Sequence, residues 1–538
     1  MSAVPSPAPT EKASRRWSAV TWLWSRRFAL VYVALGAWFI LHVARFHDAQ
    51  TGFAPMVLFG DRFASERLTR LRDVPLYTYR NSAGYDGQFY AQIAVAGNPF
   101  DPELRTALDS PAYRTGRILL PVIAHVAGFG RPTLVLAAYA LSNVVCWLLL
   151  AWATARWWFP PTSVDNLLRW IGTMFGAGML VSVSRSLTDA PALLFVATGV
   201  RCIEMNRGRL GASLLAAAGL VREMSVLAAA AFVRPISRGR SAWRRDLLSA
   251  CACVLPAVIW FGVLSVHYGA ASKGGLGALG FPLVALIDKC KAIASTVQTA
   301  GLNDAQDDIY VVAAVLVQVA FVLGRPRPAL PWWRVGAAFA VLALFLGVGH
   351  WEDAPMAVPR TLLPLTLAFN VLAPRTGAGL ALILAGNLTV LSSSRTFDPF
   401  GSEQTTFAEE LTCDFASGWH GPEHLGMRTW RWSSGSALLT FHNPAARPIP
   451  IVIDFALLTR TDRTVVVSAD GVSQSVTLKG SHGVPVHFGP VELQPGDTAV
   501  AFETSEPAWA EPGPHGRPLA FSLQNLRVTV VPTPVESR

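Results

Sequence analysis

Residues 209–233 read RLGASLLAAAGLVREMSVLAAAAFV, a long apolar run with Arg222 and Glu223 at its centre. One helix over this run would be long enough to cross a bilayer, but it would hold two charges at bilayer depth, where a charge is costly. Basic residues flank the run on both sides: Arg201, Arg207, Arg234, Arg238, Arg240, Arg244 and Arg245. Because basic loops stay on the cytoplasmic side, we predict two short helices that form a hairpin, with Arg222 at its outer tip.

The composition of the whole chain agrees with a membrane protein. Of its 538 residues, 52% are apolar and only 15% are charged, against about 25% charged in ordinary soluble domains. Disordered, collagen-like and disulfide-scaffold proteins are therefore excluded, and so is a fully soluble enzyme. The net charge of +10 comes from short basic runs between apolar segments, which is typical of cytoplasmic membrane loops rather than of a nucleic-acid partner. The six cysteines show no metal-binding spacing.

The positions of the apolar segments predict a polytopic α-helical membrane protein. Residues 1–27 are expected to form a cytoplasmic N-terminal tail, and a first span follows at 28–44. Further apolar segments lie at 133–155, 168–186, 189–203, 209–233, 247–267, 308–324, 335–350, 356–373 and 377–393. With the hairpin this gives about eleven transmembrane helices, an N-terminus in the cytoplasm and a C-terminus outside.

Two regions outside the spans are long enough to carry a function. Within the transmembrane domain, 28–393, residues 45–131 form a long outer loop, and its 118–129 stretch is expected to be a surface helix. Residues 394–538 contain short β-branched segments between Pro, Gly and Asp turns: Ser436–Phe441, Ile451–Leu457, Thr464–Ser468, Ser475–Leu478, Thr498–Phe502 and Val528–Val531. They predict an extracytoplasmic β-sandwich or jelly-roll domain.

The outer loop contains the strongest candidate for chemistry, the stretch AGYDGQFYAQIA at residues 83–94. An aspartate between two glycines can simply be a turn residue. Here, however, aromatic residues and Gln88 surround Asp86, and a helix-like run follows. A carboxylate held at the membrane surface on a tight backbone is well placed to take a proton from a hydroxyl group. We therefore expect Asp86 to be catalytic, with Tyr85 and Gln88 in contact with substrate.

The stretch around Asp86, placed after a first span, resembles the first-loop motif of GT-C glycosyltransferases, a superfamily that includes bacterial relatives of the GPI mannosyltransferases. The resemblance covers residues 28–393 by architecture and only short patches by residue. It implies transfer of a sugar from a polyprenyl-phosphate donor, with inversion at the anomeric carbon. Asp86 would deprotonate the acceptor hydroxyl while arginines stabilise the departing lipid phosphate.

Further polar patches resemble those of the same superfamily. The run YRTGRILLP at 113–121 offers Arg114 and Arg117 for the donor phosphate, because a guanidinium fork suits a tetrahedral anion. Both can equally be arginines that reach lipid headgroups. Asp189, in the turn after residues 184–188, is either a helix cap or a site residue.

The hairpin tip and a late loop complete the set of candidates. Arg222 is expected to bind phosphate with Glu223 as its partner, since an unpaired charge in an apolar run is costly. His350 and Arg360 belong to the late loop, where Arg360 is either a phosphate ligand or an interfacial anchor. The one cofactor left open is a divalent cation, Mg or Mn, held by Asp86 together with two adjacent acids, Glu352 and Asp353.

The function expected is therefore sugar transfer from a polyprenyl-phosphate donor to a glycan or lipid acceptor, with membrane lipid as surroundings and no nucleic acid. The composition suits a bacterial inner membrane with its active face in the periplasm. A flippase for lipid-linked sugars would also need arginines, but it has less need for a long loop with a carboxylate. A non-catalytic, glycan-binding scaffold would leave Arg222 and Glu223 unexplained. In the β domain, Trp419, Trp430 and Trp432 either stack on sugars or fill the core.

Overall fold

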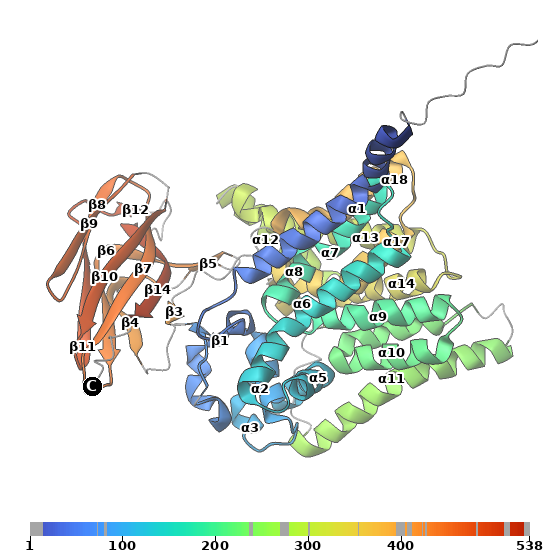
Figure 1. Cartoon of the computed structure of the whole chain (residues 1–538), viewed down its shortest axis with the longest axis horizontal. Helices are drawn as coiled ribbons and strands as arrows, with labels where there is room; N and C mark the ends of the chain where they lie inside the picture. The colour runs from blue at the N-terminus through green and yellow to red at the C-terminus, as the bar shows by residue number, and fades with distance from the viewer. Residues whose placement is uncertain are drawn as a thin grey trace, which may run out of the picture.

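The computed structural model of the chain describes most of its residues. The described ranges are 14–72, 74–79, 83–235, 240–269, 279–299, 302–352, 354–393, 397, 404–405, 411–421, 423–425, 428–479, 483–510 and 517–531. They form a helical body and a β body that lie side by side (Figure 1). The expected limits of the domains, 28–393 and 394–538, and the expected tail at 1–27 stay predictions.

The helical body is built from α-helices and short 3-10 helices. In the first half of the chain these are α1 (Ser14–Ala44), η1 (Ala54–Val57), η2 (Asp61–Glu66), η3 (Thr69–Leu71), α2 (Asp86–Ala96), α3 (Leu104–Ala107), α4 (Pro111–Thr115), α5 (Leu119–Ala127), α6 (Pro132–Trp157), α7 (Val164–Met174), α8 (Ala177–Ser184) and α9 (Asp189–Glu204). The later ones are α10 (Gly208–Val221), η4 (Glu223–Phe232), α11 (Arg240–Tyr268), α12 (Val284–Thr299), α13 (Leu302–Gly324), α14 (Pro331–Phe345), α15 (Val348–Glu352), α16 (Ala354–Thr361), α17 (Leu363–Leu372), α18 (Gly377–Gly386) and η7 (Leu388–Ser392).

Four helices among the described residues are long and apolar enough to cross a membrane, namely parts of α1, α6, α11 and α13. A fifth span is present if α7 and α8, which meet at an angle of 44°, are counted as one. The chain is therefore a membrane protein, while the expected number of about eleven crossings stays a prediction. The remaining apolar helices, such as α10, α14 and α17, are shorter.

The hairpin expected at residues 209–233 is present. Helix α10 ends at Val221, Arg222 adopts an extended backbone with φ −152° and ψ 123°, and η4 begins at Glu223. Because the helix breaks at the two charges, Arg222 and Glu223 lie at the ends of two short helices instead of in the middle of one long helix. The prediction of two short helices with Arg222 between them is confirmed.

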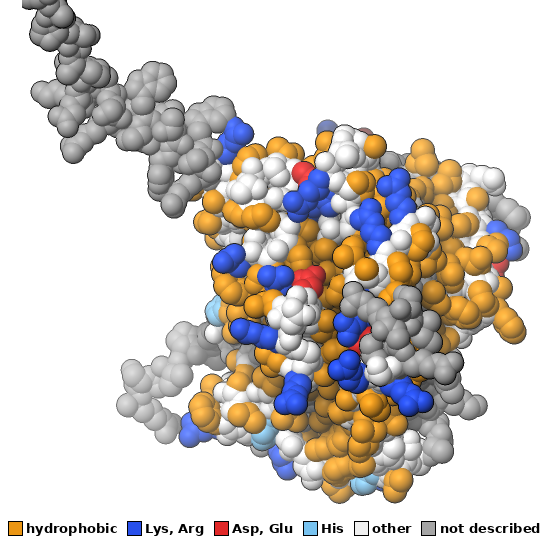
Figure 2. Space-filling model, turned by 90° about the vertical axis from the view of Figure 1, so that its right-hand side faces the viewer, with side chains coloured by type: hydrophobic (Ala, Val, Ile, Leu, Met, Phe, Trp, Pro, Cys, Tyr) orange, Lys and Arg blue, Asp and Glu red, His pale blue; other side chains and the backbone are white. Residues whose placement is uncertain are grey.

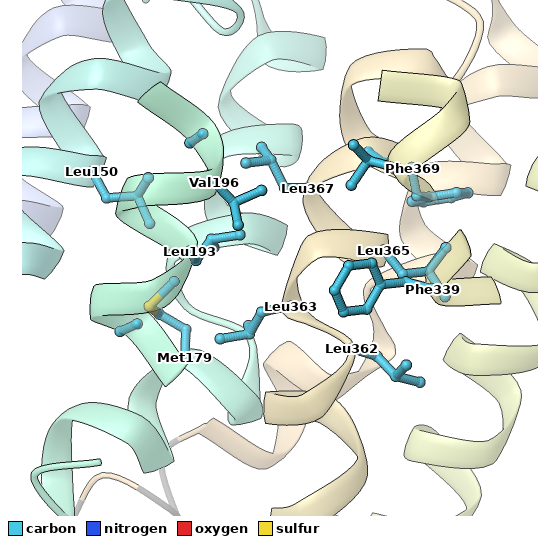
Figure 3. Packing of buried hydrophobic residues seen from close by; sticks show 14 of the residues in the cluster. Leu150, Met179, Leu193, Val196, Phe339, Leu362, Leu363, Leu365, Leu367 and Phe369 are labelled. Carbon is cyan, nitrogen blue, oxygen red and sulfur yellow. The ribbon is translucent and has the colours of Figure 1, made fainter. Parts of the chain in front are cut away.

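Most apolar side chains of this body pack into one large core that draws on most of its helices, and a second core lies under the first loop, around α2. Figure 3 shows Leu193 and Val196 of α9 facing Leu363 and Leu367 of α17, with Phe339 of α14 on the far side of α17. Packing of these side chains fixes the angles at which the helices cross. Large apolar side chains are also exposed on α1, α6 and α11, as expected for surfaces that face lipid.

The two ends of the helical body differ in charge. One end, which we call the basic end, carries exposed arginines at the helix termini: Arg156, Arg207, Arg209, Arg244, Arg245, Arg325, Arg327 and Arg375. Figure 2 looks onto this end and shows Lys and Arg side chains scattered among apolar ones. The opposite end, which we call the loop end, carries residues 45–131 and the tip of the hairpin. The distribution follows the pattern from which the topology was predicted.

The β body is one curled, mainly antiparallel sheet, extended by the short strand β3 and by two short strands of the first loop, β1 and β2. Its strands are β1 (Phe59–Gly60), β2 (Thr78–Tyr79), β3 (Gln404–Thr405), β4 (Thr412–Trp419), β5 (Glu423–Leu425), β6 (Arg428–Asn443), β7 (Ile449–Thr459), β8 (Arg463–Ala469), β9 (Val472–Leu478), β10 (Val484–Leu493), β11 (Gly496–Glu503) and β14 (Phe521–Val530). A separate pair is formed by β12 (Trp509–Ala510) and β13 (Pro518–Leu519). The expectation of a C-terminal antiparallel β domain is confirmed at this level.

The sheet curls because β6 is long enough to serve both halves. Its first part pairs with β14 and its later part with β11, and one apolar core lies inside the curl. Trp432 is buried, and Trp419 packs edge-on against Phe502 and Phe521. Burial therefore favours core packing for Trp432, while Trp419 and Trp430 are both half-buried. Trp419 nevertheless packs against phenylalanines of the core.

Some elements were not expected from the sequence. Helix α1 begins at Ser14, ahead of the predicted span, and α12 lies within a segment predicted to be a loop. Strands β4 and β10 were missed as well. Both α12 and β4 mix polar with apolar residues, and β10 contains two prolines, so none of them shows a clean hydrophobic period.

At the basic end, Arg169 of α7 acts as a cap for α17. Its side chain is 1% exposed, and it donates to the carbonyl oxygens of Asn370 (2.6 Å), Ala373 (2.9 Å) and Pro374 (2.9 Å). It also pairs with both oxygens of Asp165, at 2.8 and 3.0 Å. A cation at a helix C-terminus satisfies carbonyl groups that have no partner within the helix.

We expect Arg169→Met to lower the free energy of unfolding by about 3 kcal/mol, because it leaves a carboxylate and three carbonyl oxygens without their donor. The measurement is thermal loss of helical circular dichroism in detergent. The control is Arg156→Met, an exposed arginine on α6, with an expected effect within about 0.5 kcal/mol. Equal melting of the two variants would contradict the capping role.

Candidate functional site

Asp86 lies at the first position of α2, and two glycines bring the backbone there. Gly84 has φ +66°, and a Cβ atom at that position would lie 2.3 Å from the carbonyl oxygen of Leu58. A Cβ atom at Gly87 would lie 2.5 Å from the carbonyl oxygen of Arg185 and 2.7 Å from that of Val57. The start of α2 is thus packed backbone-to-backbone against two other segments, which only glycine permits.

The Asp86 carboxylate is ion-paired but still reachable. One of its oxygens lies 3.0 Å from Nη1 of Arg114, and the side chain keeps 26% of its exposure. Burial alone would raise the pKa of Asp86, but the guanidinium groups of Arg114, Arg360 and Arg117 outweigh it and hold the pKa below its ordinary value. The group is therefore ionised at neutral pH.

Arg114 and Arg117, predicted as phosphate ligands, are both engaged with carboxylates. Arg114 forms a two-pronged pair with Asp109, at 2.8 and 2.7 Å, in addition to its contact with Asp86. Arg117 forms a similar pair with Glu223 of the hairpin, at 2.8 and 2.7 Å. The partner that the sequence suggested for Glu223 was Arg222, whereas the structure pairs Glu223 with Arg117.

Asp189 joins Arg222 of the hairpin tip to Arg360 of α16. Its side chain is 1% exposed. One oxygen contacts Nη1 of Arg222, and the other lies 3.7 Å from Nη1 of Arg360. Arg222 also donates to the hydroxyl of Thr361 at 2.9 Å. Since two cations from separate elements converge on this buried carboxylate, Asp189 is more than the helix cap considered from the sequence. In the structure the N-cap position of α9 is occupied by Thr188, and Asp189 is the first residue of the helix.

Tyr85 lies close to two guanidinium groups. Arg185 is 4.1 Å and Arg360 is 5.5 Å from the centre of its ring, distances at which a cation is attracted to an aromatic face. Gln88 contacts the loop instead, accepting from the backbone N–H of Gly60 at 3.1 Å and donating to the carbonyl of Ala83 at 2.6 Å. Gln88 is fully buried, so the structure gives it a role in the loop backbone.

His350 of α15 belongs to the same cluster. Burial and the nearby cations Arg222, Arg360 and Arg117 lower the pKa of His350 to about 4. The imidazole is therefore neutral at physiological pH, in a region of positive potential. Such a group can accept or donate one hydrogen bond without adding charge.

The structure thus brings all ten predicted site residues to the loop end of the helical body, where α2, α4, α9, α15, α16 and the hairpin tip meet. It adds groups that the sequence reasoning missed: Tyr90, Asp109, Tyr113 and Arg185. Tyr90 could have been found, since it follows Asp86 by four residues in a helix and so shares its face. Asp109 and Arg185 come from segments whose approach depends on tertiary packing.

A divalent cation finds no ready site among the described residues. No group of three or more His, Cys, Asp or Glu side chains comes together there as metal ligands. Each acid of the cluster, Asp86, Asp189 and Glu223, faces an arginine instead. Asp353 and the side chain of Glu352 lie outside the described residues.

Comparisons with known proteins give no family for the chain. No family model and no curated protein matches it. Among solved structures, arabinosyltransferase EmbB from Mycobacterium smegmatis is similar over 83% of this chain and 64% of that chain, with 10% identity and a TM-score of 0.26. The GH26-CBM35 β-(1,4)-mannanase of Podospora anserina is similar over 24% of this chain and 27% of that chain, with 19% identity and a TM-score of 0.15. Both TM-scores are low, so neither likeness carries a functional inference.

We expect His350→Gln to flatten the dependence of stability on pH below neutrality. The imidazole of His350 has a pKa of about 4 in the folded chain and 6.5 as its ordinary value. As the pH falls, the unfolded chain therefore binds a proton at this histidine before the folded chain does. Stability is then lost as the pH falls from about 6.5 to about 4, by roughly 3 kcal/mol. The measurement is chemical unfolding of wild type and His350→Gln at several pH values. Parallel curves for the two proteins would refute the lowered pKa.

Proposed function

We propose that the chain is an integral membrane glycosyltransferase of the GT-C type. It transfers a sugar from a polyprenyl-phosphate-linked donor to an extracytoplasmic glycan or lipid acceptor, with inversion. The observation that carries the proposal is the convergence, at one end of a membrane protein, of a partly exposed carboxylate with arginines from several separate elements. A base and a set of phosphate-binding cations are the two things that this chemistry requires.

In the proposed step, the acceptor hydroxyl oxygen attacks the anomeric carbon of the donor sugar. The bond from that carbon to the phosphate oxygen breaks, and its electron pair leaves with the polyprenyl phosphate. The hydroxyl proton passes to the carboxylate of Asp86. Phosphate is a good leaving group, so arginines that stabilise its charge suffice and no general acid is needed. The lowered pKa of Asp86 keeps the base ionised before the acceptor arrives.

The arginines divide the work between them. Arg114 and Arg117 each hold a carboxylate through two hydrogen bonds, which suits a role in fixing the site. Arg360 makes a longer contact of 3.7 Å with Asp189 and lies over Tyr85. We therefore assign the donor phosphate to Arg360 and Arg222, with His350 close by. Asp189 keeps these two cations together when no donor is bound.

The proposed setting is a bacterial inner membrane, with the loop end and the β body in the periplasm and the basic end in the cytoplasm. The reaction would then serve polysaccharide biosynthesis in the cell envelope. The lipid tail of the donor lies among the membrane-spanning helices, which accounts for a catalyst embedded in the bilayer. A flippase remains the second candidate, because it too needs cations for a lipid phosphate.

Asp86→Asn is expected to abolish transfer, because an amide cannot accept the hydroxyl proton. A general base contributes about a hundredfold to ten-thousandfold in rate. The measurement is transfer from a panel of radiolabelled polyprenyl-phosphate sugars in reconstituted vesicles, together with donor binding. Binding is expected to persist in the variant.

Other outcomes separate the candidates. Equal transfer by wild type and Asp86→Asn would remove Asp86 from the mechanism but leave the enzyme. If wild type transfers no sugar from any donor yet moves labelled lipid across the vesicle membrane, the flippase replaces the enzyme.

Gly87→Ala is expected to reduce transfer by about a hundredfold, because a methyl group would push the start of α2 off the backbone at Arg185, and displacement by about an ångström costs that much. The control is Gly36→Ala on α1, where a Cβ atom meets nothing within 4 Å. The control is expected to match wild type. Full activity of Gly87→Ala would show that the close packing of α2 does not position Asp86.

A further inference from the structure

Tyr90 is a buried polar residue that the mechanism above does not use. It lies on α2 four residues after Asp86, and residues four apart share a face of a helix. Its side chain is fully buried. A phenylalanine would fill the same volume without a polar atom to satisfy, so the hydroxyl group calls for a separate explanation.

The hydroxyl oxygen of Tyr90 is where two arginines meet. It accepts a hydrogen bond from Nη1 of Arg114 at 3.3 Å and another from Nη1 of Arg117. A hydroxyl oxygen has two lone pairs, and the two arginines occupy both. Burial, the largest effect, raises the pKa of Tyr90 to about 12, so the group stays neutral and keeps its proton.

These two arginines belong to different ion pairs. Arg114 contacts Asp86 and Asp109, both in the first loop. Arg117 holds Glu223, which is the first residue of η4 in the hairpin. The Tyr90 oxygen is the point at which the two pairs join.

We propose that Tyr90 is a positioning residue for Asp86: its hydroxyl oxygen holds the Arg114 and Arg117 guanidinium groups together, and so fixes the cation that orients the base. Two guanidinium groups repel each other, and a shared acceptor offsets that repulsion. Without the hydroxyl, Arg114 can turn away from Asp86 towards Asp109 alone. This inference rests on the proposed role of Asp86 as the base.

The expected effect on the base follows from the charges around it. Asp86 faces Arg114, Arg117 and Arg360, and Tyr90 faces Arg114, Arg117, Tyr113 and Asp86. If Tyr90 no longer holds the first two cations, their stabilisation of the carboxylate weakens and the pKa of Asp86 rises. A base with a higher pKa is protonated at higher pH, so the acid limb of the rate profile moves upward.

The test compares Tyr90→Phe with Tyr32→Phe. Tyr32 is a buried tyrosine on α1 that donates one hydrogen bond to the carbonyl of Phe159, at 2.9 Å, away from the cluster. For Tyr90→Phe we expect kcat to fall about ten- to hundredfold, the usual effect of losing a hydrogen bond to a charged group. The KM for the donor should stay near the wild-type value. Tyr32→Phe should change neither kcat nor the acid limb.

A second variant and a second readout guard against a folding defect. Arg117→Lys keeps the charge but loses the planar fork that reaches Glu223 through Nε and Nη2 and Tyr90 through Nη1, so it should reproduce the loss of kcat. The double variant should lose no more than either single variant. If the two losses multiply, or if Tyr90→Phe keeps the wild-type kcat and acid limb, the proposal is overturned.

The titration of Asp86 can be followed without any reaction. The protein is labelled with ¹³C-aspartate, and its infrared spectrum is compared with that of Asp86→Asn. The difference spectrum reports the ionisation of the Asp86 carboxylate and contains no signal from histidine. The pH at the midpoint of the Asp86 titration should be higher in Tyr90→Phe than in wild type. If wild type transfers no sugar, the proposed function fails, yet this midpoint still decides the role of Tyr90. An unchanged midpoint overturns it.

Discussion

The site depends on one constraint: a guanidinium group taken out of water must be given a carboxylate or carbonyl oxygen. At the loop end several buried arginines meet an acid from another element, as Arg117 meets Glu223 and Arg222 meets Asp189. At the basic end helix carbonyl groups meet much of the same need, as for Arg169, which also pairs with Asp165 of its own helix. An arginine that pairs with carbonyl groups caps the end of a helix. An arginine that pairs with a carboxylate of another element holds the two elements together, and it leaves a titratable acid beside a guanidinium group.

The sequence was sufficient to predict those features of the fold and the site that depend on one segment of the chain. The apolar run interrupted at Arg222 predicts its own break, because no helix keeps two charges at bilayer depth without partners. Asp86 was recognisable from its glycines, which the structure shows to be required by backbone contacts at Val57 and Leu58. The choice of partners was beyond the sequence. Whether Glu223 takes Arg222 or Arg117 depends on how α4, α9 and the hairpin pack, and no local pattern records that.

For some residues the sequence neighbours suggested a role, and only the burial of the side chain in the structure shows what the residue contacts. Gln88 lies next to the candidate base and was expected to touch substrate, yet it is buried and binds the backbone of the loop. In the β body, Trp419 and Trp432 were open to two interpretations, because an aromatic side chain suits either a core or a sugar face. The curl of the sheet around β6 buries Trp432 and packs the half-buried Trp419 against the core.

The short strands β1, β2 and β3 link the first loop to the end of the chain, since β2 pairs with β1 and β3, and β3 pairs with β14. The backbone of β1, in turn, holds Gln88 through Gly60. The segment that carries Asp86 is therefore hydrogen-bonded, strand by strand, to β14 of the β body. The backbone position of the candidate base thus depends on strands that lie far apart in the sequence. Loss of β14 from the sheet would free β3, and through β2 and β1 it would loosen the loop that carries Asp86.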